Sequence, residues 1–170
     1  NIYYTSFFAA WSDTPTNAGG RYISAFCPRI LMFPDSTERF ISDYPDGHIV
    51  SSVRDPRTWY ASASRHAPIF GDVRKAIKMW KLSTACTIKL KKMMPDYIFL
   101  TSYEKLVSET EDTMGRMAAF LGIDFDDSLL MPTYASKPIL PNSSYERKSY
   151  GVNTDSTKTA AQLNDDDRAY

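Results

Sequence analysis

Two short runs of apolar and β-branched residues, 48–53 and 97–101, predict the strands of a sheet. The first run follows a turn at residues 45–47. Between the two runs, residues 72–93 predict a long helix, with side chains at helical spacing at Val73, Ile77, Trp80, Thr84 and Ile88. Strand, helix and strand in this order predict an α/β fold with a parallel sheet and crossover helices.

Shorter segments predict further helices around this sheet. Asp55 is a good N-cap and Pro56 a good first residue for a helix that runs to about residue 65. Near the end of the chain, Asn164 is placed to cap a helix whose first turn holds three aspartates. The other predicted helical segments are residues 7–11, 37–44, 103–107 and 111–121, the last with Gly122 at its end.

Length and composition are those of an ordinary globular protein with one domain, residues 1–170, whose polar tail covers residues 142–170. Lys and Arg number 20 and Asp and Glu number 20, so the net charge is zero and we expect no nucleic-acid partner. No apolar run reaches transmembrane length, so we expect no membrane partner either. The first residues read like the middle of a domain, and we expect both ends of the chain to be cut.

Cys27 and Cys86 are too few for a disulfide framework or a metal site. We therefore expect no metal, and a reducing, cytoplasmic location. Residues 65–92 are rich in Lys and Arg, and Asp72 is the acidic residue among them. A solvated helix face is one interpretation of this basic stretch, and contact with an acidic partner is the other.

Two residues directly after the predicted strands, Arg54 and Tyr103, are the first candidates for a site. Ligands on parallel sheets bind beyond the carboxyl ends of the strands. An arginine at a strand end offers a planar fork of donors that fits phosphate oxygens, and Ser62, eight residues on, offers a hydroxyl from the following helix. In the alternative interpretation, Arg54 pairs with a core carboxylate and Ser62 packs against the sheet.

Four motifs in order resemble one family. Arg54-Asp55-Pro56-Arg57 after a strand, with Ser62 behind it, resembles the 3′-phosphate motif of the sulfotransferases that use 3′-phosphoadenosine 5′-phosphosulfate (PAPS). Tyr103-Glu104 after the second strand resembles the family's Tyr-Glu turn. Residues 120–123 resemble the family's Phe-Leu-Gly helix end, and the segments at 132–133 and 142–145 together resemble its tail pattern, especially that of the bacterial branches.

The resemblance implies a fold, a reaction and a binding site. The fold would be a P-loop-NTPase-like, three-layer α/β/α arrangement with a parallel sheet, incomplete at its N-terminus. The reaction would transfer a sulfuryl group from PAPS to a hydroxyl or amine of a small-molecule or glycan acceptor. Arg54 and Ser62 would bind the 3′-phosphate of the cofactor, and Tyr103 would lie beside the adenine. Arg147 and Lys148 resemble the basic loop that closes over the same phosphate, and a solvated basic turn is the alternative for them.

The sequence departs from the family pattern at the sulfate end. The Gly- or Ser/Thr-rich loop with a cation, which would hold the phosphosulfate, has no counterpart in the chain, and we expect it upstream of Asn1. The alternative is a non-catalytic α/β interaction module that lost this loop. A P-loop kinase fragment is disfavoured by the Arg54 and Ser62 pattern. The catalytic base is unassigned, and a homo-oligomer remains open.

Overall fold

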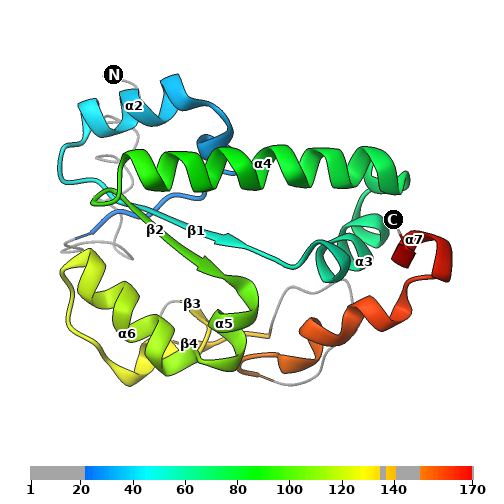
Figure 1. The fold of residues 1–170 in the computed structure, drawn as a ribbon. Coiled ribbons are helices and arrows are strands. Elements are labelled where there is room, and N and C mark those ends of the chain that lie inside the picture. Colours follow the sequence, from blue (N-terminus) through cyan, green and yellow to red (C-terminus); the bar gives the residue numbers. More distant parts are fainter. Residues whose placement is uncertain (1–21, 135–136, 141–149, 170) are drawn as a thin grey trace.

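The computed structural model describes residues 22–134, 137–140 and 150–169 of the chain. Its centre is a parallel sheet of two strands, β1 (Ile49–Val53) and β2 (Ile98–Ser102), with Ile49 opposite Ile98 and Val53 opposite Ser102 (Figure 1). Both strands lie within one residue of the predicted runs. The α/β class and the parallel sheet are therefore confirmed.

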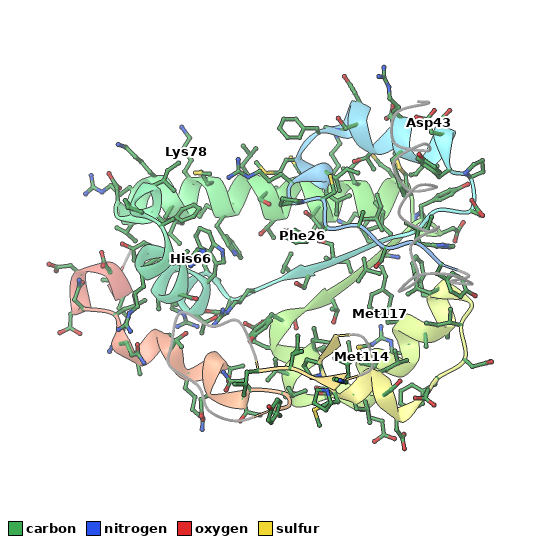
Figure 2. All side chains as sticks on the ribbon, turned by 180° about the vertical axis from the view of Figure 1, so that it is seen from behind. Phe26, Asp43, His66, Lys78, Met114 and Met117 are labelled. Atoms are coloured by element: carbon green, nitrogen blue, oxygen red, sulfur yellow. The ribbon has the colours of Figure 1, made fainter. Side chains whose placement is uncertain are left out.

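Two helices and a short 3-10 turn connect the strands: α3 (Pro56–His66), η2 (Pro68–Phe70) and α4 (Val73–Met93). Asp55 caps α3 by accepting from the backbone N–H groups of Arg57 and Thr58, and Asp72 caps α4 in the same way. The predicted cap and start of α3 are thus both found. Figure 1 shows α4 running along one side of the strands, and Figure 2 shows Lys78 pointing away from the sheet on its outer face.

The remaining helices of residues 22–122 flank this unit. The segment before β1 forms η1 (Ile30–Met32) and α2 (Pro34–Asp43), and the segment after β2 forms α5 (Tyr103–Ser108) and α6 (Thr110–Leu121). Gly122 ends α6 in the left-handed conformation at φ 64°, which a glycine adopts without strain. In Figure 1, α6 lies on the side of the strands opposite α4.

A cluster of buried apolar residues lies at the amino ends of the two strands. Leu31, Ile49, Leu90 and Ile98 form one cluster there, and Phe40 of α2 packs against it. The carboxyl ends of the strands point away from this core. An apolar base therefore holds the amino end of the sheet and leaves its carboxyl edge for polar side chains, where open α/β sheets bind ligands.

The C-terminal part carries more structure than the sequence predicts. After η3 (Asp127–Leu130) and the short antiparallel pair β3 (Thr133–Tyr134) and β4 (Lys137–Pro138), it forms η4 (Thr154–Gln162) and α7 (Asp165–Ala169). Asn164 caps α7 as predicted, because its side-chain oxygen accepts from the Asp167 N–H at 2.7 Å. The 3-10 helix η4 was not predicted, and it packs against α3.

Some predictions fall on residues outside the described ranges. The helix expected at 7–11 and the basic pair Arg147 and Lys148 belong to this group. Within the described ranges, the helices are all too short or too polar to cross a membrane.

Candidate functional site

The parallel register brings the residues after the two strands to one edge of the sheet. Val53 and Ser102 are the last paired residues, so Arg54 and Tyr103 leave the sheet side by side. The guanidinium carbon of Arg54 lies 4.5 Å from the centroid of the Tyr103 ring. This is the geometry of a cation–π contact, which holds a cation against one face of an aromatic ring.

Two threonine hydroxyls also hold the guanidinium of Arg54. Its Nε donates to Thr58 Oγ1 at 3.1 Å, and its Nη2 donates to Thr159 Oγ1 at 3.4 Å. Thr58 lies in the first turns of α3 and Thr159 in η4, and both are buried. The half-buried Arg54 side chain is therefore oriented by hydrogen bonds along one edge and by an aromatic ring on one face.

The backbone between β1 and α3 is held from two directions. The indole Nε1 of Trp80 on α4 donates to the Arg54 carbonyl at 3.0 Å. The Asp55 N–H donates to the Glu104 Oε1 on α5 at 3.0 Å. Backbone groups at a strand end need such partners because the ladder no longer supplies them. The contact between Asp55 and Glu104 also joins the two motifs that the sequence places 49 residues apart.

Asp55 is ionised and tied to α3. Burial alone would raise the pKa of its carboxyl, but hydrogen bonds from the Arg57 side chain and from the N–H groups of Thr58 and Arg57 lower the pKa below its ordinary value. Arg57 forms an ion pair with Asp55 at 3.2 Å, and its side chain is 62% exposed. The positive charge of Arg57 is thus largely balanced by its own neighbour.

Ser62, predicted as the second phosphate ligand, is half-buried one helical turn after Thr58. Residues four apart lie on the same face of a helix, about 5–6 Å apart at Cβ. Ser62 therefore continues the hydroxyl face that Thr58 begins. Thr58 was not predicted from the sequence, where its signal was its place in the first helical turn after a strand-end arginine.

The two histidines occupy different places in the fold. His48 precedes β1 at its amino end, and its ring packs edge-on against Phe120 at 4.9 Å between centroids. His66 is the exposed last residue of α3 (Figure 2). Within the described ranges, no cluster of three His, Cys, Asp or Glu side chains could hold a metal ion.

A shallow hollow of about 540 Å³ lies at the start of α6. Its lining holds three carboxylates, and it consists of Glu109, Glu111, Asp112, Gly115 and Phe125. Carboxylates repel an anionic ligand, so this hollow does not suit a phosphate. The strand-end cluster around Arg54 is the better candidate because it offers a cation, hydroxyls and an aromatic ring.

The fold is that of an α/β protein with a small parallel sheet, and its candidate site is a strand-end arginine with hydroxyls and an aromatic ring beside it. The model of one family, described as "Sulfotransferase family", matches residues 5–127, and the chain belongs to this family. The match includes Arg54, Ser62 and Tyr103 and ends before Arg147, Lys148 and Thr159. Comparisons with curated proteins and with solved structures found no match.

Proposed function

We propose that the protein binds PAPS as a sulfuryl donor and that the residues at the carboxyl edge of its sheet hold the nucleotide end of this cofactor. The observation that carries the proposal is the held guanidinium of Arg54, 4.5 Å from the Tyr103 ring. The acceptor would be a hydroxyl or amine of a small molecule or glycan. The P-loop-like layering and the cytoplasmic location belong to the proposal as well.

The residues at the edge fit a ribose 3′-phosphate. An arginine fork gives two parallel, charge-assisted hydrogen bonds to phosphate oxygens, and such bonds are the strong ones in proteins. Ser62 lies on the same face of α3 as Thr58 and would add a hydroxyl donor. Glu104 is the nearby acid, and one of its oxygens, Oε1, already accepts a hydrogen bond from the Asp55 N–H.

The same edge fits an adenine ring. Tyr103 offers an aromatic face, and its ring already carries the Arg54 guanidinium in a cation–π contact. A purine beside Tyr103 would therefore have its ribose phosphate within reach of the arginine. Arg147 and Lys148, outside the described residues, are proposed to close over the same phosphate.

When bound, PAPS supplies an activated sulfuryl group for in-line transfer. Catalysis of such transfer rests mainly on positioning and on electrostatic stabilisation, as in phosphoryl transfer. The described residues would contribute to the positioning: they anchor the nucleotide at the 3′-phosphate and leave the sulfate end free to meet the acceptor.

Calorimetry with adenosine 3′,5′-bisphosphate tests the proposal. A hydrogen bond to a charged group contributes roughly 1.5–3 kcal/mol, so Arg54→Ala should weaken binding about ten- to a hundredfold. The matched control is Arg116→Ala on α6, whose side chain is 62% exposed and pairs with Asp112 at 3.8 Å. This control should bind like the unaltered protein.

A second ligand separates the 3′-phosphate from the rest of the nucleotide. Adenosine 5′-phosphate lacks the 3′-phosphate, so Arg54→Ala should change its affinity little. Equal affinity of the unaltered protein for the two nucleotides, or an unchanged affinity of Arg54→Ala for the bisphosphate, would contradict the proposal.

A further inference from the structure

Thr159 joins the C-terminal 3-10 helix η4 to the strand-end site. It is 5% exposed and lies 105 residues after Arg54 in the chain. Its Oγ1 donates to the Thr58 carbonyl at 3.2 Å and accepts from Arg54 Nη2 at 3.4 Å. A buried hydroxyl between a helix carbonyl and a guanidinium is unlike the surface threonines of a polar tail.

The chemistry of a hydroxyl fixes what Thr159 can do. A threonine has one O–H proton and two lone pairs. Because the proton is directed to the Thr58 carbonyl, the lone pairs are turned toward Arg54. Thr159 is therefore an acceptor for the arginine rather than a donor to a phosphate.

The two threonines hold the same edge of the guanidinium. Thr58 accepts from Nε and Thr159 accepts from Nη2, and these two nitrogens form the lateral edge of the planar fork. Once this edge is fixed, the plane of the guanidinium and the direction of its other edge, Nη1 and Nη2, are fixed too. The other edge is the one that we assign to a phosphate.

The position of Thr159 is itself anchored. Two residues after Thr58, the buried Tyr60 lies near Asp167 of α7: burial, and then the negative charge of Asp167, raise the pKa of the tyrosine, so α7 also lies close to α3. Arg168 donates to the carbonyls of Ala161 and Leu163 at 3.2 and 3.0 Å and so links α7 back to η4. The position of Thr159 on α3 thus rests on the packing of η4 against α3 and on α7, which follows it in the chain.

We infer that Thr159 is a positioning residue for Arg54, and that through it η4 belongs to the phosphate-binding site. The inference rests on the proposed function, because it assigns the 3′-phosphate to Arg54. It adds a residue that lies beyond the matched part of the family, in the polar tail. Loss of the Thr159 hydroxyl should leave Arg54 charged and present, but free to turn from the phosphate.

Thr159→Val tests the inference because valine keeps the shape of threonine and lacks its hydroxyl. Because Arg54 then loses one of its neutral hydrogen-bond acceptors, binding of adenosine 3′,5′-bisphosphate should weaken about three- to tenfold. Binding of adenosine 5′-phosphate should not change. The control is Thr157→Val in the same 3-10 helix, where the hydroxyl donates to the Thr154 carbonyl at 2.7 Å. Thr159→Ser retains the hydroxyl and should bind like the unaltered protein.

A purely structural role predicts a different pattern. If Thr159 only docks η4 on α3, Thr159→Val lowers the unfolding midpoint while the ratio of the two nucleotide affinities stays constant, and the inference fails. The inference also fails if Thr159→Val weakens bisphosphate binding as much in an Arg54→Ala background as in the unaltered protein, because a residue that acts through Arg54 has no further effect without it.

These outcomes are distinct from a failure of the proposed function. If the unaltered protein does not prefer the bisphosphate to the 5′-phosphate, the 3′-phosphate site itself is wrong and the role of Thr159 falls with it. If the preference is present and Thr159→Val keeps it in full, only the role of Thr159 is wrong. Should Thr159→Val fail to fold, Thr159→Ala and Thr159→Ser form the comparison, with the loss expected in the alanine variant alone.

Discussion

Trp80 offers a test of how the protein fixes the backbone of the site. Its indole Nε1 donates to the Arg54 carbonyl at 3.0 Å from α4, across the crossover connection. Trp80→Phe keeps an aromatic ring at this half-buried position and removes the donor. The carbonyl at the end of β1 then loses the partner that α4 provides.

The size of the effect follows from the burial of the bond. Leaving a buried acceptor without its donor costs about 1–3 kcal/mol. Because the Arg54 to Trp80 bond is only partly buried, water can replace part of it, and we expect the lower half of this range, about 1–2 kcal/mol. The smaller ring also loses apolar contact, so a control with the same change in size is needed.

Trp59→Phe is that control. Trp59 is half-buried on α3, and its ring packs edge-on against Phe70 with 5.4 Å between centroids. Urea unfolding of both variants should show Trp80→Phe to be less stable than Trp59→Phe by about 1–2 kcal/mol, and only Trp80→Phe should weaken adenosine 3′,5′-bisphosphate binding, by several-fold. Equal stability and equal affinity in the two variants would refute the claim that Trp80 sets the backbone of Arg54.

Two further predictions concern how the stability of the fold depends on pH, through Asp55 at the start of α3 and Tyr60 within α3. Asp55 has a pKa below its ordinary value of 3.8, so its charge stabilises the fold above that value, and the stabilisation is lost as the pH falls through the lower, folded-state pKa. Asp55→Asn keeps a capping side chain but removes the charge, so the free energy of unfolding should fall less steeply at acid pH than in the unaltered protein. The same acid dependence in both proteins would show that the charge of Asp55 does not stabilise the fold. Burial, then the charges of Asp167 and Asp72, raise the pKa of Tyr60 above its ordinary value of 10.0. The protonated Tyr60 therefore stabilises the fold fully below pH 10.0, and this stabilisation is lost as the pH rises through the higher, folded-state pKa. Tyr60→Phe should therefore reduce the alkaline loss of stability, whereas Tyr150→Phe, at a 59% exposed position, should follow the unaltered protein.

The sequence was informative wherever a local pattern determined the structure. Asp55 and Pro56 predicted the start of α3 because capping and a fixed proline φ are properties of adjacent residues. The alternation of strand and helix predicted the parallel pairing, and with it the meeting of Arg54 and Tyr103 at one sheet edge. The resemblance to sulfotransferases rested on these same residues and is confirmed by the family match.

The sequence was uninformative about contacts between distant segments. Helical spacing predicted α4 but not its buried face: Ile88 is 41% exposed, whereas Thr87 and Leu90 are buried. Thr159 lies in a polar tail without apolar periodicity, and its burial depends on packing against α3 that no local pattern encodes. The hydrogen bond of Trp80 was likewise not predictable. Its spacing indicated a core residue, but its indole also donates to the Arg54 carbonyl.

The location of bound adenosine 3′,5′-bisphosphate in a crystal of the protein tests the central claim most directly. We predict the 3′-phosphate within hydrogen-bonding distance of the Arg54 guanidinium and the adenine against the Tyr103 ring. A nucleotide bound elsewhere, or bound here with its 3′-phosphate turned away from Arg54, would contradict the account.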